Sequence, residues 1–211
     1  VRSATRLAGA AAAAERLEAV ARTPAAVLDP ATPAPLAPGG EVDFRSVRFG
    51  YDPDHPVLGP LDFTIRDGEA VAIAGPSGAG KSTIAHLLVR LADPQAGAVR
   101  VAGCDIRSVS REALRARVAL MTQDAPVFLD TVRANLLIGR HAAGDADLWH
   151  VLETVRLADF VRSLPQGLDA VVGEAGRTLS AGQARRLCLA RTLLSDAAVL
   201  VFDEPTSGLD F

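Results

Sequence analysis

The feature that most constrains this sequence is an apolar run that leads through a glycine-rich loop into a helix. Residues 70–74 are all apolar, residues 75–82 read GPSGAGKS, and residues 82–91 read as a helix. Glycines let successive backbone N–H groups turn inward around an anion, and the start of the following helix adds its positive dipole end. This order predicts a buried strand that carries a phosphate-binding loop, within an α/β fold.

The loop carries residue types that hold a nucleoside triphosphate and its metal ion. Lys81 supplies a point charge for the β- and γ-phosphates, and the Ser82 hydroxyl is a hard oxygen ligand for Mg²⁺. The predicted nucleotide-binding residues of this segment are Gly75, Pro76, Ser77, Gly78, Ala79, Gly80, Lys81, Ser82 and Thr83.

A second apolar run, residues 199–202, ends in two adjacent carboxylates. Asp203 is predicted to reach Mg²⁺ through water, and Glu204 lies where a base could polarise the attacking water. Two acids beside a polyphosphate are costly unless a cation or a reaction requires them. The pair therefore favours a catalytic site over a simple strand end.

A third segment, residues 179–183 (LSAGQ), is predicted to open another helix, with Ser180 as its N-cap. Alone it indicates only a helix start. Together with the phosphate loop and the acidic pair, it resembles the signature motif of the ATP-binding cassette (ABC) family, from about residue 41 to the C-terminus. The family usually has glycine where this chain has Ala181. The signature residues are Leu179, Ser180, Ala181, Gly182 and Gln183.

Other segments are similar to further motifs of that family. Tyr51 resembles the aromatic residue that stacks on adenine, although a strand tyrosine is the alternative. Gln123 resembles the glutamine that senses Mg²⁺ and the attacking water. Residues 207–210 resemble the loop that crosses between subunits, with Asp210 as its acid and Gly208 where alanine is commoner.

The resemblance implies a mechanism and partners. ATP and Mg²⁺ are the expected cofactors. Glu204, Lys81 and Gln123 are the expected catalytic residues, and Ser82, Gln123 and Asp203 the expected Mg²⁺ ligands. A second ABC domain, identical or homologous, is expected head to tail, so that residues 179–183 act on the partner's ATP.

Two segments resemble exporters with fused membrane domains. One runs from Gln123 to Leu136. The other, residues 172–176, would bring Glu174 to a transmembrane partner. Among exporters, the sequence most resembles bacterial thiol (cysteine/glutathione) exporters of cytochrome bd assembly. The expected location is the cytoplasmic face of the inner membrane.

The expected fold is a P-loop NTPase (RecA-like) α/β core with an antiparallel β subdomain, a helical insertion at about residues 124–182, and C-terminal strands missing. Residues 1–22 are predicted to form a helix, either an ordinary amphipathic one or the end of a preceding transmembrane domain. Residues 23–40 are a proline-rich linker, and residues 41–211 the ABC domain.

Composition narrows the function classes. The net charge of −3 gives no basic surface for nucleic acid, and no apolar run is long enough to span a bilayer, so the piece itself is expected to be soluble. The family's switch histidine is expected beyond residue 211, so we predict weak ATP binding and poor hydrolysis by this piece. A degenerate ATP-binding half of a transporter and a soluble ABC ATPase remain alternatives.

Overall fold

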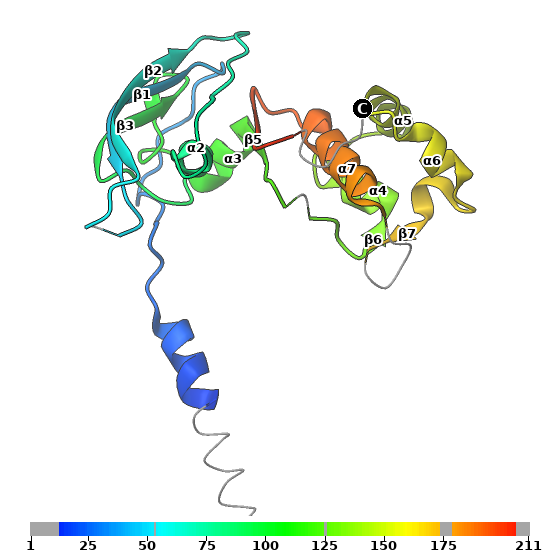
Figure 1. Ribbon diagram of the computed structural model, residues 1–211, viewed down its shortest axis with the longest axis horizontal. Coiled ribbons are helices and arrows are strands. Elements are labelled where there is room, and N and C mark those ends of the chain that lie inside the picture. Colours follow the sequence, from blue (N-terminus) through cyan, green and yellow to red (C-terminus); the bar gives the residue numbers. More distant parts are fainter. Residues whose placement is uncertain (1–12, 53, 125, 174–178, 206–211) are drawn as a thin grey trace, which may run out of the picture.

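The structure, a computed structural model, describes residues 13–52, 54–124, 126–173 and 179–205. Two lobes lie side by side in Figure 1. One holds an antiparallel sheet with the helices α2 (Lys81–Leu88) and α3 (Arg111–Arg117). The other is mostly helical and surrounds α7 (Ala181–Leu194). The predicted antiparallel subdomain and helical insertion are both present.

The antiparallel sheet has the strand order β2-β1-β3-β4. Its strands are β1 (Val42–Phe49), β2 (Leu58–Ile65), β3 (Ala96–Val101) and β4 (Cys104–Asp105). The alternation of apolar residues along residues 42–49 slips by one position between Phe44 and Val47, and the structure has a bulge there. The register of β1 shifts against both neighbours, and Ser46 has a φ of +46°.

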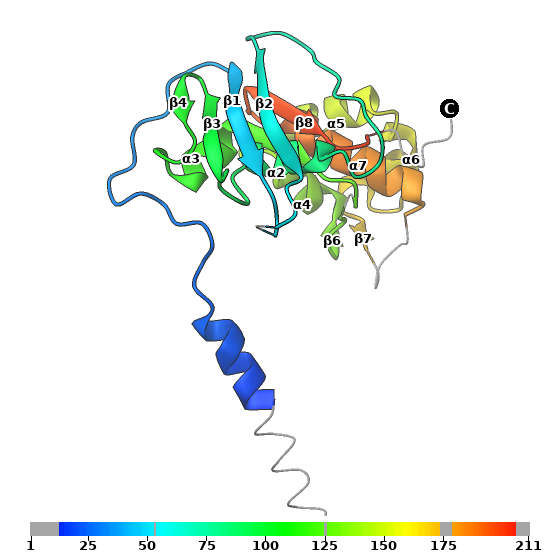
Figure 2. The same ribbon diagram turned by 60° about the vertical axis from the view of Figure 1, so that its left-hand side comes forward.

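One face of this sheet packs on α2 and α3. Val42, Phe44 and Val47 of β1 are buried together with Leu87 of α2 and Leu114 of α3. Figure 2 shows the two helices behind the sheet. The alternation of apolar residues along β1 therefore fixes which sheet face supports the helix that follows the phosphate loop.

The helical lobe has its own core. It contains α4 (Val132–Leu137), α5 (Asp145–Thr154), α6 (Ala158–Ser163), the 3-10 turn Gly167–Asp169, and α7, with a small antiparallel pair, β6 (Asp130–Thr131) and β7 (Val171–Val172). Leu136, Leu148, Leu152 and Leu187 are fully buried between these helices. The lobe is thus a packed unit that can hold α7 in place.

A parallel pair of strands joins the lobes. β5 (Val118–Met121) pairs in register with β8 (Val199–Phe202), and the Asp203 N–H extends the ladder to the Met121 carbonyl at 2.9 Å. The two strands therefore deliver Gln123 and the acidic pair to the same end of the sheet.

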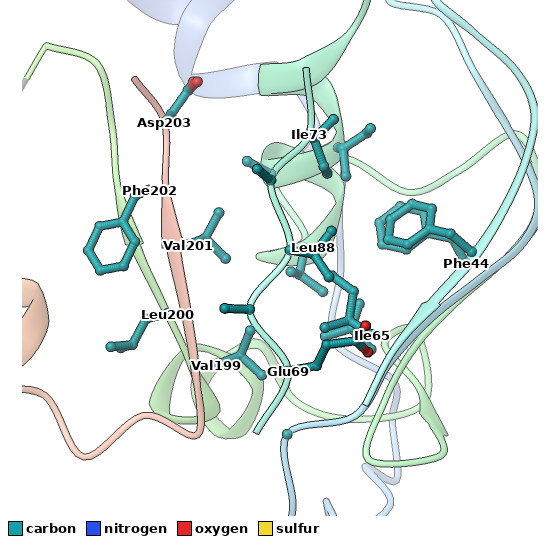
Figure 3. A pocket seen from close by; sticks show the side chains of 18 of the residues that line it. Phe44, Ile65, Glu69, Ile73, Leu88, Val199, Leu200, Val201, Phe202 and Asp203 are labelled. Carbon is teal, nitrogen blue, oxygen red and sulfur yellow. The ribbon is translucent and has the colours of Figure 1, made fainter. Parts of the chain in front are cut away.

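The prediction of a buried strand at residues 70–74 is wrong for this structure. The segment forms no strand, and Val71 and Ile73 are 48% and 45% exposed. A cavity of about 690 Å³ lies between this segment, β8 and the sheet. Figure 3 shows Ile73 and Glu69 across the opening from Val199 and Val201. A strand requires hydrogen-bonding neighbours, and this cavity separates residues 70–74 from β8.

The N-terminal part matches its prediction where it is described. Residues 13–22 are helical and exposed, and Arg22 pairs with Glu18 at 2.5 Å. The helix stands away from the two lobes (Figure 1). Residues 1–12 of the predicted helix lie outside the described residues. In the part of the chain that the structure describes, no helix is both long and apolar enough to cross a membrane.

The proline-rich segment has no regular structure, yet part of it is anchored to the sheet lobe. Val27 is buried, and the Ala34 N–H donates to the Ser108 carbonyl at 2.8 Å. Asp29 accepts from the Arg111 side chain at 3.0 Å. Residues 27–34 are therefore a docked strap, which composition alone did not indicate.

Candidate nucleotide-binding site

The phosphate loop ends at Gly80, where α2 begins, and any other residue at this position would be strained. Gly80 is the N-cap of α2 with a φ of +87°, and no side chain caps the helix. A Cβ at this position would lie 2.6 Å from the Leu58 Cδ2 atom, and Leu58 is buried. The helix start is therefore open to an anion, and its backbone conformation depends on glycine.

Lys81 lies at the first position of α2 and folds back over the loop. Its Nζ atom donates to the Gly75 carbonyl at 2.9 Å and to the Pro76 carbonyl at 2.8 Å. The ammonium group therefore lies against the loop that the sequence assigned to phosphate. Such a placement suits a cation that exchanges carbonyl partners for phosphate oxygens.

The predicted nucleotide residues meet in a cavity of about 360 Å³ beside the loop. The cavity joins the loop to Tyr51, Gln123 and Glu204. It is lined by Tyr51, Val57, Ser77, Gly78, Gly80, Lys81, Ser82, Thr83, Gln123 and Glu204. Among the predicted residues, Gly75, Pro76, Ala79 and Asp203 do not line it. The larger cavity of Figure 3 is mostly apolar, and Lys81, Asp203 and Glu204 also line it. The smaller cavity is the one that joins the loop to Tyr51 and Gln123.

Tyr51 is held over the first turns of α2. Its hydroxyl lies 3.1 Å from His86 Nδ1 and 3.4 Å from Thr83 Oγ1, and its ring meets Phe49 edge-on at 5.0 Å between centroids. The residue is 65% exposed, so a ring face is available for stacking. The contact of His86 with Tyr51 could not be predicted from the sequence, because the two residues lie 35 positions apart.

Gln123 and Glu204 lie together at one side of the cavity. The Gln123 Nε2 atom donates to Glu204 Oε2 at 2.9 Å. Glu204 is exposed, and its φ of +49° lies in the left-handed region, which non-glycine residues rarely occupy. Asp203 lies just before it, at the end of β8 and at the border of the larger cavity (Figure 3).

Ser180 opens α7 with a capping box. Its hydroxyl accepts from the Gln183 N–H at 3.2 Å, and its own N–H donates to Gln183 Oε1 at 2.9 Å. None of residues 179–183 lines the cavity beside the phosphate loop. The structure therefore confirms the capped helix start and places it away from this chain's own loop. Asp210 and Glu174 lie outside the described residues.

Arg191 fastens the C-terminal half of α7 to α4. Arg191 donates to the Asn135 carbonyl at 2.8 Å and to Asn135 Oδ1 at 2.9 Å. Burial lowers the pKa of Arg191 and raises the pKa of the neighbouring Cys188 thiol. The thiol stays neutral, and α7 is fastened to α4 through hydrogen bonds from a partly desolvated cation.

Metal-binding groups are sparse in the described part of the chain. No group of three or more His, Cys, Asp or Glu side chains there could hold an ion. Ser82 and Gln123 nevertheless line the same cavity. Hydroxyl and amide oxygens are hard donors that suit Mg²⁺ when phosphate oxygens complete its shell.

Comparisons with known proteins agree with this geometry. The family described as ABC transporter matches residues 58–207. The ATM1-type heavy metal exporter of Novosphingobium aromaticivorans is 44% identical over 181 residues, which cover 86% of this chain and 30% of that protein. The mitochondrial iron-sulfur clusters transporter ATM1 of Debaryomyces hansenii is 43% identical over 171 residues, covering 81% of this chain and 25% of that protein.

A solved structure shares the fold. The structure of a bacterial Atm1-family ABC exporter with ATP bound has a TM-score of 0.85 and 42% identity, and the match covers 93% of this chain and 34% of that one. The chain thus spans about a quarter to a third of the length of these relatives. The resemblance to thiol exporters stays a prediction. Because the family match covers most of the sequence and the solved relative has the same P-loop NTPase fold, this chain belongs to the ABC transporter family as an ATPase domain of the exporter type.

Proposed function

We propose that this chain is the ATP-hydrolysing motor domain of a membrane exporter. The observation that carries the proposal is the cavity in which Tyr51, Gln123 and Glu204 meet the phosphate loop. Tyr51 offers a ring face to the base, the loop and Lys81 hold the phosphates, and Glu204 takes a proton from the attacking water. The similar proteins are named as exporters and transporters, which supports this use.

Mg²⁺ is assigned to the Ser82 hydroxyl and the Gln123 side chain, with Asp203 bound through water. Because Gln123 Nε2 donates to Glu204, its Oε1 atom is available for a metal. When bound, the ion would neutralise the phosphate oxygens. Chelation by EDTA should stop hydrolysis, and hydrolysis that persists in EDTA would contradict this assignment.

A second ABC domain is needed to complete the site. The signature residues lie away from this chain's own cavity, so Ser180 and Gly182 are assigned to ATP held by a partner that is identical or homologous and packed head to tail. Residues 1–22 are assigned to the end of a preceding transmembrane domain, residues 23–40 to a linker, and residues 41–211 to the ATPase domain. This connection would place the domain at the cytoplasmic face of the membrane.

Glu204→Gln in the complete transporter tests both hydrolysis and pairing. The variant keeps the size of the side chain and the hydrogen bond with Gln123 but removes the base. It should lose hydrolysis at least about a hundredfold and retain ATP through gel filtration, with the two ATP domains held together. Glu112→Gln, which changes an exposed carboxylate on α3, is the matched control.

Two outcomes would contradict the proposal separately. Unchanged hydrolysis in Glu204→Gln would remove Glu204 from its role. Hydrolysis lost without trapped ATP or paired domains would contradict the shared site. A degenerate, purely ATP-binding domain is the second candidate, and the direct contact of Gln123 with Glu204 favours turnover over it.

A further inference from the structure

Arg185 is a buried cation whose contacts are two backbone carbonyls. It lies in the second turn of α7 and is 7% exposed. One guanidinium nitrogen donates to the Glu204 carbonyl and another to the Gln123 carbonyl, both at 2.5 Å. A buried charge is costly unless it is hydrogen-bonded. The two hydrogen bonds therefore offset the cost of burying the Arg185 guanidinium.

The two carbonyls mark the place where the parallel strands leave the sheet. The β5–β8 register ends at Met121 and Phe202, and the last backbone bond of the ladder joins Asp203 to Met121. Beyond it, the Gln123 and Glu204 side chains touch at 2.9 Å. Arg185 therefore joins the two backbones at the positions where the hydrolytic side chains meet.

Glu204 requires such a restraint. Its left-handed φ of +49° is strained for a non-glycine residue and persists only where surrounding contacts impose it. Its side chain is exposed, so packing contributes little. The bond from Arg185 to the Glu204 carbonyl supplies a restraint from a rigid helix.

We propose that Arg185 is a positioning residue for ATP hydrolysis. It holds the ends of β5 and β8 so that Gln123 and Glu204 stay in contact, and it connects the helix that Ser180 opens to the hydrolytic pair of the same chain. The inference rests on the proposed function, because it assigns Glu204 as the base. Because Arg185 belongs to α7, the proposal also predicts that a displacement of α7 changes the Gln123–Glu204 contact.

Arg185→Met in the complete transporter is the test. Methionine keeps most of the side-chain length and removes both hydrogen bonds. The kcat for ATP hydrolysis should fall about tenfold or more, which corresponds to one charge-assisted hydrogen bond, while the KM for ATP stays within about twofold, because Arg185 does not line the nucleotide cavity.

Two further readouts separate positioning from mere stability. Amide hydrogen exchange should become faster in the peptides that contain Gln123 and Glu204. In a Gln123→Ala background, Arg185→Met should cause much less additional loss of kcat, because the contact that Arg185 maintains is already absent. Arg191→Met is the matched control: it removes a cation of the same helix that contacts Asn135, so exchange should increase in α4 instead.

Several outcomes would overturn the inference. One is amide exchange at Gln123 and Glu204 that is as slow in Arg185→Met as in the wild type. Another is a loss of kcat on Arg185→Met that is the same in the wild-type and Gln123→Ala backgrounds. If wild-type protein hydrolyses no ATP, the proposed function fails, and the exchange measurement alone decides on Arg185. If Arg185→Met does not fold, Arg185→Lys replaces it in the test. The lysine ammonium can donate to only one of the two carbonyls, so amide exchange should become faster at the end of β5 or of β8, but not at both. Exchange as slow as in the wild type at both strand ends would contradict the proposal.

Discussion

Helices α2 and α7 begin in opposite ways, although both starts were predicted to contact phosphate. α2 begins at Gly80, which is left-handed, and no side chain accepts a hydrogen bond from its first turn. α7 begins at Ser180, which has an extended backbone and forms a reciprocal capping box with Gln183. The first is open toward the nucleotide cavity, and the second is already satisfied by its own residues.

The difference fits the proposal that a phosphate site is divided between two chains. The first N–H groups of a helix lack partners within the helix. At α2 they remain for an anion, so the start of the helix depends on glycine and on the bound phosphate. At α7 the capping box fixes the geometry of the helix start without a ligand, as the proposed contact with a partner's nucleotide would require.

Lys81→Ala should have the largest effect on nucleotide binding. Lys81 is the only lysine in residues 1–211, and its ammonium lies at the mouth of the loop. Loss of a charge-assisted contact should weaken ATP binding about ten- to hundredfold, measured by titration with a fluorescent ATP analogue. ATP should also protect Lys81 from an amine-directed reagent, as read by mass spectrometry.

Lys81→Arg is the control for that variant. It keeps the positive charge but presents a planar fork instead of a compact ammonium, so it should restore binding only in part. If Lys81→Ala binds ATP like the wild type, α2 is not the phosphate-holding end, and the contrast between the two helix starts fails.

Gly80→Ala should weaken ATP binding less than Lys81→Ala does. Substitution of Gly103 separates the cost of the steric overlap from the cost of the left-handed backbone. A Cβ at Gly80 meets Leu58 at 2.6 Å, whereas Gly103 has a similar φ of +76° and nothing within 4 Å. Gly103→Ala should cost about 1–2 kcal/mol of unfolding free energy for the left-handed backbone. Gly80→Ala should cost about 1–3 kcal/mol more because of the overlap, and it should weaken ATP binding severalfold.

Thermal or denaturant unfolding of both variants measures the difference. Equal destabilisation would mean that Leu58 moves aside without cost, and the dependence of α2 on glycine would then be a matter of backbone conformation alone.

Local features of this molecule were predictable from the sequence, and contacts between distant segments were not. The N-cap at Ser180 depends on residues a few positions apart, so it could be predicted directly from the sequence. The role of Arg185 could not be predicted from the sequence, because its partners, Gln123 and Glu204, lie 62 and 19 residues away and contribute backbone carbonyls. Carbonyls are present in every residue and leave no sequence signal.

Residues 70–74 and 199–202 illustrate the same limit. Both are short apolar runs that lead to functional residues, and both were predicted to be buried strands. Only the second forms a strand, because β5 lies beside it in register, whereas the first faces a cavity of about 690 Å³. Apolar composition indicates a tendency to be buried, but a strand also requires a neighbour that completes its hydrogen bonds.

Ser180→Ala should have the smallest effect on nucleotide binding by its own chain, and Ser110→Ala is its structural match. Ser110 caps α3 by accepting from the Ala113 N–H at 3.2 Å, the same distance as the bond from the Gln183 N–H to Ser180. Each substitution should lower the unfolding free energy by about 1 kcal/mol. Neither should change ATP affinity measured in EDTA, where the domains do not turn over nucleotide.

The two caps should differ only when the domains pair. With Mg²⁺ and the complete transporter, Ser180→Ala should reduce hydrolysis if the start of α7 contacts the partner's ATP as proposed, while Ser110→Ala should retain the wild-type rate. If Ser180→Ala instead weakened ATP binding in EDTA as strongly as Lys81→Ala, both helix starts would serve one site in one chain. Equal hydrolysis rates for Ser180→Ala and Ser110→Ala would mean that the N-cap of α7 only stabilises its helix. An N-cap with that role alone contributes the same unfolding free energy in α3 as in α7, and it does not affect hydrolysis.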